Sequence, residues 1–528
     1  MPMILSFGWL IVAAIVLLVL RQLNINRGRI WLAALGFSIS QWGILLALRW
    51  FIPLEQSFTK WFPLEELFVD GIVLKLDVFS WSLAFAISAV QLAIILTDST
   101  RMEELPTTNV WSGICLISAM GIVAVLSSSV LSILLVWAMV DVTELVVILR
   151  TVKTEKSINE AVSGFSIRFL GSIVLIIAVM ASYSLGTPLD FNHVTGNIGM
   201  LVIIAVGFRM GVLPLNLPYA NELPFRRGIG NAIRNLSVMS SLVVLIRFSG
   251  GMFVGVGENL LYTLVSLAAF FAAVMWLVVK NELEGRPFWI ISMAALAIYS
   301  CMVGNSPASL AWGLSLVLNG SVLFLYSTRT VKIQTLPLLA VVGFSGLPFT
   351  PSAAGWVAII APEHIFQTLL NVFSVLLLIF GYLRLILKSS PQTANHERWV
   401  WVIYPLGLFF PILTQWLIFF LSGINWFQTG VLWASVFAFL VPLLLILVLR
   451  RLSGLAEYSE WIFKFLEKLG DIVTGILKLN WLYKIFGNIL AVFRWFTELF
   501  SRLLEEQGGI MWVFVLVALL ITLLKPAG

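Results

Sequence analysis

Long apolar runs recur along the whole chain and alternate with short polar segments. Because a membrane-spanning helix needs roughly 20 predominantly apolar residues, the pattern predicts about sixteen spans. They cover residues 4–20, 30–52, 78–97, 108–127, 130–149, 164–183, 196–213, 229–248, 259–279, 288–304, 308–327, 335–360, 365–387, 400–422, 429–449 and 510–524. No basic segment precedes the first run, so we expect a retained span there and no cleavable signal peptide. The predicted fold class is all-α, a polytopic membrane protein.

Two segments depart from this simple pattern. The run 335–360 is interrupted by GLPFTPSAAG, from Gly346 to Gly355, which predicts a broken helix. Such breaks are tolerated at membrane depth only where protein or a water-filled cavity covers the backbone. In residues 452–507, Trp, Phe, Leu and Ile alternate with Lys, Glu and Arg at helical spacing. This alternation predicts an amphipathic segment that lies laterally in the membrane surface.

Composition agrees with the membrane class. The chain is 60% hydrophobic and 11% charged, whereas a soluble domain carries about 25% charged residues. The formal net charge of +6 comes from lysines and arginines in alternate loops, so it does not indicate a nucleic-acid partner. By the positive-inside rule these loops face the cytoplasm. This predicts a multi-pass protein of the inner (plasma) membrane, with both termini outside the cytoplasm.

The sequence lacks the motifs that bind common cofactors. It has no Walker loop, no dinucleotide fingerprint and no cluster of His or Cys ligands. Its two cysteines, Cys115 and Cys301, each lie within an apolar run. We therefore expect no cofactor, no metal and no catalytic residue in this chain.

Five ionisable residues inside the predicted spans are the candidate site for ion translocation: Asp141, Glu144, Arg168, Arg209 and Arg234. A charge at the bilayer centre costs roughly 2.5–3.5 kcal/mol on insertion scales, so each needs a partner or a function. Asp141 and Glu144 are three residues apart and share one helix face, which predicts that Asp141 lies close to Arg209 or Arg168. Two alternatives remain: a structural ion pair between packed helices, and arginines that snorkel to an interface.

Two motifs carry a family resemblance. In the first, Arg209 is followed by four residues, by Pro214, and then by Leu-Pro-x-Ala at 217–220; the second is GLPFTPSAAG. With the layout of the first fourteen spans, they resemble the antiporter-like membrane subunits of respiratory complex I and of Mrp-type cation/proton antiporters. The lateral segment and the sixteenth span make the chain most similar to the largest antiporter-like subunit of complex I.

The chain departs from this family at its ionisable positions. Arg209 stands where the family usually has Lys, and Ala138 stands where it has a carboxylate. In the second half, the positions at which the family carries ionisable residues are apolar: Leu316, Gly320 and either Val357 or Ala358. The ionisable series is therefore broken in the second half.

The resemblance implies a division into five parts. Transmembrane helices occupy residues 1–107, an antiporter-like core of inverted repeats 108–400, and further core helices 401–451. The lateral segment, 452–507, and a final transmembrane helix, 508–528, complete the chain. Its implied partners are the lipid bilayer and other membrane subunits of a hetero-oligomeric complex.

The function implied by the resemblance is proton or cation translocation by a membrane subunit of a complex I-like or Mrp-like assembly, coupled to a partner module. One alternative is a degenerate subunit that has a structural role and conducts nothing. Another is the membrane partner of a soluble enzyme in an energy-coupled inorganic-carbon uptake system. Because the chain has no redox motif, the sequence leaves open whether it belongs to an enzyme such as an NADH:quinone oxidoreductase-type translocase.

Overall fold

The computed structural model describes most of the chain up to residue 451. The described residues are 2–58, 68, 71–101, 109–151, 155–186, 188–191, 194, 196–215, 227–248, 257–361, 363–388, 397–424, 431–451 and 468. They all belong to one compact unit, Met1–Gly470, whereas a second unit, Asp471–Gly528, lies outside them. The predicted lateral segment, except for Lys468, and the predicted span 510–524 also lie outside the described residues.

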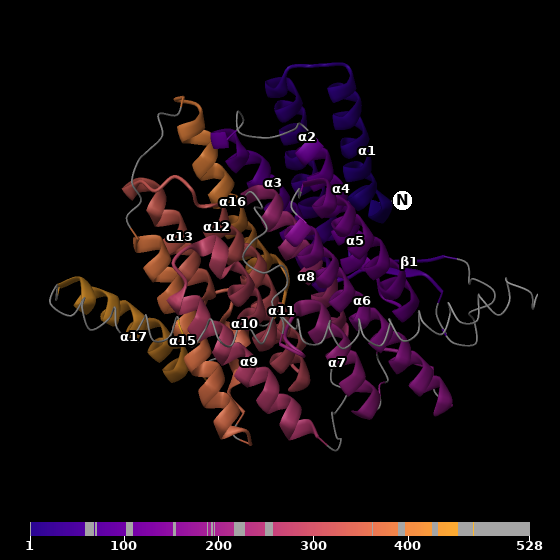
Figure 1. Ribbon diagram of the computed structural model, residues 1–528, viewed down its shortest axis with the longest axis vertical. Helices are drawn as coiled ribbons and strands as arrows, with labels where there is room; N and C mark the ends of the chain where they lie inside the picture. Colours follow the sequence, from indigo (N-terminus) through magenta and orange to yellow (C-terminus); the bar gives the residue numbers. More distant parts are fainter. Residues whose placement is uncertain are drawn as a thin grey trace, which may run out of the picture. The chain divides into compact units, whose positions relative to one another are not determined.

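Helices make up nearly all of the described structure (Figure 1). The α-helices are α1 (Pro2–Gln22), α2 (Arg27–Leu48), α3 (Val78–Thr97), α4 (Asn109–Leu126), α5 (Val130–Thr151), α6 (Glu155–Ser184), α7 (Gly196–Met210), α8 (Arg227–Arg247), α9 (Glu258–Val278), α10 (Glu282–Met302), α11 (Ser306–Leu314), α12 (Gly320–Leu325), α13 (Val331–Phe344), α14 (Ala353–Ile359), α15 (Ile365–Leu387), α16 (Val400–Leu421) and α17 (Leu432–Arg451). Short 3₁₀ turns occupy Arg49–Phe51 and Asp98–Arg101. Within the described residues, ten helical segments are long and apolar enough to cross a membrane, which confirms the all-α polytopic fold class.

The predicted break in the run 335–360 is present. Helix α13 ends at Phe344 and α14 begins at Ala353, so residues 346–352 of the motif GLPFTPSAAG lie in the connection and its last three residues begin α14. The sequence did not predict a second interruption, in the run 308–327. There, a π-helical turn, η3 (Ser315–Asn319), joins α11 to α12. Because a π-helical turn shifts the backbone hydrogen-bond register, it makes carbonyl groups accessible to side-chain donors.

A short hairpin crosses one end of the helices. Strands β1 (Leu54–Ser57) and β2 (Val73–Leu76) are antiparallel and place Glu55 opposite Lys75. The residue that follows β2, Asp77, begins α3 with a capping box: its carboxylate accepts from the Ser80 backbone N–H, and the Ser80 hydroxyl accepts from the Asp77 N–H, both at 2.8 Å. This cap satisfies backbone donors that the first turn of a helix leaves open.

Helix α8 lies inside the bundle (Figure 1). Its apolar window is entirely buried, and it packs against α3, α4, α5, α7, α10, α11 and α12. By contrast, α1, α2 and α6 bury only a third of their apolar windows. Their outward apolar faces suit a lipid environment or neighbouring membrane subunits, whereas α8 contacts only protein along its length.

Buried tryptophans join these helices through main-chain carbonyls. The indole N–H of Trp276 donates to Leu378 O at 3.1 Å, and that of Trp312 donates to Gly355 O at 3.0 Å. A buried indole needs such a partner because no water is available to its N–H. Glycines make room for the rings: a Cβ at Gly355 or at Gly381 would lie 2.6 Å from Trp312 or Trp276, respectively.

The variants Gly355→Ala and Gly381→Ala should therefore unfold at lower temperature in detergent. An added Cβ forces the ring or the backbone to shift, and overpacking of this kind costs about 1–3 kcal/mol. Gly43→Ala in α2 is the matched control, because nothing lies within 4 Å of its Cβ position; it should be neutral or slightly stabilising. Thermal unfolding of the purified proteins is the measurement, and equal losses in all three variants would contradict this packing.

Candidate functional site

Three neighbouring helices bring four of the five predicted site residues together. Asp141 and Glu144 lie on α5, Arg168 on α6 and Arg209 on α7. All four are buried, with exposed fractions of 1%, 2%, 4% and 3%. Four formal charges are therefore removed from water inside a bundle of membrane helices, where each requires a close partner.

Asp141 and Arg209 form a bidentate ion pair. The Arg209 Nη1 donates to Asp141 Oδ2 at 2.6 Å, and Nη2 donates to Oδ1 at 2.8 Å. This parallel pair of bonds matches the planar fork of the guanidinium and fixes its orientation. The Nε of Arg168 lies 3.5 Å from the same carboxylate. Asp141 thus faces the bundle interior between both arginines, as its spacing along α5 predicts.

Arg168 connects Asp141 to the second carboxylate. Its Nη1 donates to Glu144 Oε1 at 2.7 Å and to the Ser237 hydroxyl of α8 at 3.3 Å. The four residues therefore form one continuous buried charge row, in the order Glu144, Arg168, Asp141, Arg209. Its formal charge is zero, which is the condition under which buried ions are tolerated in a low-dielectric interior.

The surroundings of Arg209 hold its side chain on every side. Its guanidinium lies 4.2 Å from the centre of the Trp137 ring, a cation–π contact. Its N–H groups also donate to the Ser172 hydroxyl at 3.2 Å and the Ser241 hydroxyl at 3.4 Å. Gly171 permits this approach, because a Cβ there would lie 2.8 Å from Arg209 Cγ. Arg209 is thus a fixed cation and not one that snorkels to an interface.

The fifth predicted residue, Arg234, lies on α8, whereas the other four lie on α5, α6 and α7. It precedes Ser237 by one helical turn, and its charge acts on the buried Arg286 of α10. Along α8, Arg234 lies between Ser237, which accepts from Arg168, and Arg227 at the start of the helix.

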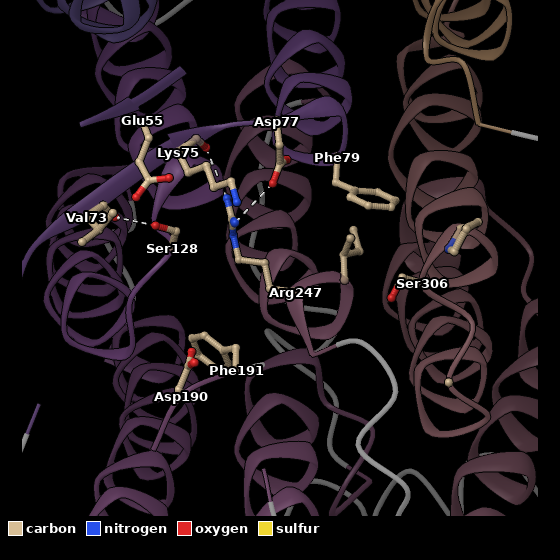
Figure 2. A pocket seen from close by; sticks show the side chains of 13 residues that line it. Glu55, Val73, Lys75, Asp77, Phe79, Ser128, Asp190, Phe191, Arg247 and Ser306 are labelled. Carbon is tan, nitrogen blue, oxygen red and sulfur yellow. Dashed lines mark hydrogen bonds and ion pairs between the residues drawn. The ribbon is translucent and has the colours of Figure 1, made fainter. Parts of the chain in front are cut away.

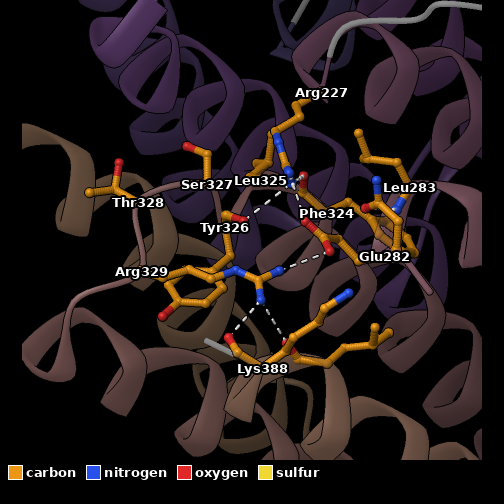
Figure 3. A network of polar contacts seen from close by, with 12 residues as sticks. Arg227, Glu282, Leu283, Phe324, Leu325, Tyr326, Ser327, Thr328, Arg329 and Lys388 are labelled. Carbon is orange, nitrogen blue, oxygen red and sulfur yellow. Dashed lines mark hydrogen bonds and ion pairs between the residues drawn. The ribbon is translucent and has the colours of Figure 1, made fainter. Parts of the chain in front are cut away.

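At that end, Glu282 holds two arginines together (Figure 3). Its carboxylate accepts from Arg227 Nη2 at 2.7 Å and from Arg329 Nη2 at 2.9 Å. Arg227 Nη1 also donates to the main-chain carbonyls of Phe324 and Tyr326, at the end of α12. Arg329 Nη1 donates to those of Leu385 and Lys388, at the end of α15. Cations at helix C-termini satisfy open carbonyls and complement the helix dipole, so these contacts join α8, α10, α12 and α15.

In the second half, a tryptophan occupies the place that the resemblance assigns to ionisable residues. The Trp289 N–H donates to Leu316 O at 3.0 Å, a carbonyl of the π-helical turn. A Cβ at Gly320 would lie only 2.6 Å from the same indole nitrogen. Leu316 and Gly320 therefore form the wall against which this ring packs. Substituting ionisable residues there would require the indole to move.

The buried amides and hydroxyls of this region bond to one another. Asn235 Nδ2 donates to Asn231 Oδ1 at 2.8 Å and to the Ser321 hydroxyl at 2.9 Å. Gln415 Nε2 donates to the Ser315 hydroxyl at 3.4 Å. Amides and hydroxyls can hold water, but they do not store a proton near neutral pH.

Several of these contacts lie beyond sequence reasoning. Trp289 and Gly320 are separated by 31 positions. In the sequence, Trp289 could equally be an ordinary core residue and Gly320 an ordinary glycine of a helix. The pairing of Glu282 with Arg329 depends on how α10 lies against the segment between α12 and α13, which no local pattern predicts. The signal that was available, a glycine within an apolar run, does not identify the ring that fills the space.

The fold defines the class of protein: a polytopic all-α membrane protein, in which the buried charge row joins α5, α6 and α7. The comparisons with solved structures support this class. The chain matches a chain in the structure of the Mrp complex from Dietzia sp. with a TM-score of 0.71 and 16% identity, over 99% of this chain and 62% of that one. This chain therefore spans less than two thirds of the matched Mrp chain.

A second match is to a chain of the membrane-bound sulfane sulfur reductase, an archaeal respiratory membrane complex. Its TM-score is 0.66 and its identity 11%, over 99% of this chain and 100% of that one. No protein-family model matches the sequence, and no curated protein sequence matches it. The antiporter-like fold that the sequence predicts is confirmed, whereas the particular subunit is not identified by these similarities.

Asp141→Asn should lower the free energy of unfolding by about 3–5 kcal/mol, because it leaves Arg209 buried without its counter-charge. The double variant Asp141→Asn/Arg209→Gln should recover part of that loss, with a coupling of about 0.5–3 kcal/mol. Denaturant unfolding in detergent measures both. Val142→Ala is the control, since this neighbour on α5 is 53% exposed. Losses that simply add in the double variant would mean that the two side chains do not stabilise each other.

Proposed function

We propose that this chain is a membrane subunit of an Mrp-like or complex I-like assembly and takes part in translocating protons or other cations, coupled to a partner module. The observation that carries the proposal is the buried charge row of Glu144, Arg168, Asp141 and Arg209. An ionisable cluster at membrane depth is costly, and ion pathways are its commonest use. The similarity to chains of the Mrp complex and of an archaeal respiratory membrane complex supports the same reading.

The roles within the row follow from the chemistry of its side chains. Arginine keeps its proton under all physiological conditions, so Asp141 and Glu144 must carry any proton that moves. Arg168 lies between them, 2.7 Å from Glu144 and 3.5 Å from Asp141. When a proton neutralises Glu144, Arg168 is attracted to Asp141 alone; when the proton leaves, Arg168 is drawn back. Arg209 is the fixed counter-charge of Asp141 in this cycle.

A second candidate function is a structural subunit that conducts no ions. The contact between Trp289 and Leu316 favours it, because an indole fills the region in which a continuous ionisable series would have to pass. In this case the charge row is a cross-link between α5, α6 and α7, and its neutrality is its only requirement. Both candidates have the same fold, so an ion-flux measurement must separate them.

Asp141→Asn should abolish ion coupling in reconstituted vesicles, as should the double variant Asp141→Asn/Glu144→Gln. Arg209→Lys should retain part of the coupling with an altered pH dependence, because lysine exchanges its proton more readily than arginine. Glu155→Gln, at the exposed start of α6, is the matched control and should behave like the parent protein. Unchanged coupling in the single and double carboxylate variants would contradict a proton path through the charge row and would support the structural subunit that conducts no ions.

We further propose that residues 452–507 brace neighbouring subunits in the assembly. An amphipathic segment of this length has apolar side chains for contacts with adjacent helices and a charged face for the membrane surface. Deleting residues 452–528 should reduce the yield of the intact complex in detergent while the helices up to α17 stay inserted. Native gels and protease protection report the two effects, and deletion of residues 508–528 alone separates the final span from the lateral segment. Full recovery of the complex from the longer deletion would remove the bracing role.

A further inference from the structure

Arg286 of α10 is a buried cation with an open hydrogen-bonding edge. The residue is only 2% exposed, and its Nε and Nη2 have no hydrogen-bond partner within the described part of the chain. These two nitrogens lie on the same edge of the guanidinium, so their N–H groups form a fork that suits two oxygens of one oxyanion. Because a buried donor without an acceptor is costly, this edge points to an oxyanion as its ligand.

The neighbouring carboxylate of Glu282 is already shared by two other arginines (Figure 3). Glu282 precedes Arg286 by one turn of α10, but its Oε1 accepts from Arg227 at 2.7 Å and its Oε2 from Arg329 at 2.9 Å. Phe324 places Arg286 beside Arg227: its ring lies 5.0 Å from the Arg286 guanidinium, and its carbonyl accepts from Arg227 Nη1 at 3.2 Å. Among the described residues, these three arginines therefore share one carboxylate.

The opposite end of α8 has a different balance of charge (Figure 2). There, Arg247 donates to Asp77 at 3.4 Å, and Lys75 lies directly opposite Glu55 in the hairpin. These two cations, which line a pocket of about 500 Å³, each face a carboxylate of their own. One carboxylate shared by three arginines thus distinguishes the end of α8 that carries Arg227.

The arginine cluster, formed by Arg227, Arg286 and Arg329, lies where the helices reach the membrane surface. The side chains of Arg227 and Arg329 are 20% and 12% exposed, so they form its outer side, and Arg286 forms its buried base. The loop charges predict that this end of α8 faces the cytoplasm. Val331, at the start of α13 and two residues after Arg329, is 83% exposed. Basic groups between membrane helices on this side suit the phosphates of anionic lipids.

We propose that the arginine cluster binds a phosphate group, with the open edge of Arg286 as its bidentate donor and with Arg227 and Arg329 as the cations at its entrance. A phosphate matches the planar fork of a guanidinium and offsets the positive charge that Glu282 leaves uncompensated. Two sources have this chemistry: the headgroup of an anionic phospholipid and free inorganic phosphate. Phosphate binding is independent of the buried charge row, so it holds whether or not the chain moves ions.

Thermal unfolding of the delipidated full-length protein in detergent provides the test. Dioleoylphosphatidylglycerol, dioleoylphosphatidylcholine and sodium phosphate are added separately, at an ionic strength held constant with sodium chloride. A ligand that binds only the folded protein raises the unfolding temperature. A rise with phosphatidylglycerol alone would assign the site to a lipid headgroup, and a rise with sodium phosphate would assign it to free phosphate. No rise with either, or an equal rise with zwitterionic phosphatidylcholine, would overturn the proposal.

Arg286→Gln should raise the ligand concentration that gives half of this stabilisation about tenfold, because it removes a bidentate, charge-assisted contact. Arg286→Lys keeps the charge without the fork, so it should show an intermediate loss, and it carries the test if Arg286→Gln does not fold. Arg29→Gln is the matched control, since this exposed arginine near the start of α2 lies on the same predicted side of the membrane.

A purely structural role of Arg286 would lower the unfolding temperature of its variants without changing the ligand concentration at half of the stabilisation. That result would overturn the phosphate site. An equal loss of the response in Arg29→Gln would also overturn it, because the attraction would then come from the basic surface as a whole.

Discussion

The cost of an uncompensated charge inside the membrane is the constraint on which this structure depends. Each buried arginine of the charge row lies against a carboxylate, and the four formal charges of the row sum to zero. The hydroxyls of Ser172, Ser237 and Ser241 accept further hydrogen bonds from the N–H groups of these arginines. Because a buried charge that loses its partner is strongly destabilising, the row ties the three helices that supply it to one another.

The two halves of the bundle meet the same constraint in different ways. The first half pairs four buried charges in one row, whereas the second half places an indole beside Leu316 and Gly320 and pairs Glu282 with two arginines. Trp276, Trp289 and Trp312 each donate to a carbonyl of a neighbouring helix or turn, so their N–H groups are satisfied without any ion. This packing is rigid, because each ring lies against a glycine and fills the space that a Cβ at that glycine would need.

The sequence predicts the parts of this structure that depend on local pattern. The long apolar runs give the spans, and GLPFTPSAAG gives the break between α13 and α14, because glycine and proline interrupt helices in any context. The shared helix face of Asp141 and Glu144 follows from their spacing. By contrast, contacts between distant segments determine the rest. They include the π-helical turn, the packing of Trp289 against that turn, and the two arginines that bind Glu282. Arg234 shows the limit: its burial was foreseen, but its neighbours depend on how α8 meets α10.

Helix α8 is tied down at both of its ends. Arg227 is bound through Glu282 to Arg329, and Arg247 is bound to Asp77 and to the hairpin backbone. A rod anchored in this manner resists sliding along its own axis and resists tilting. Because Arg227 also donates to the carbonyls of Phe324 and Tyr326, the end of α12 is held to the same helix.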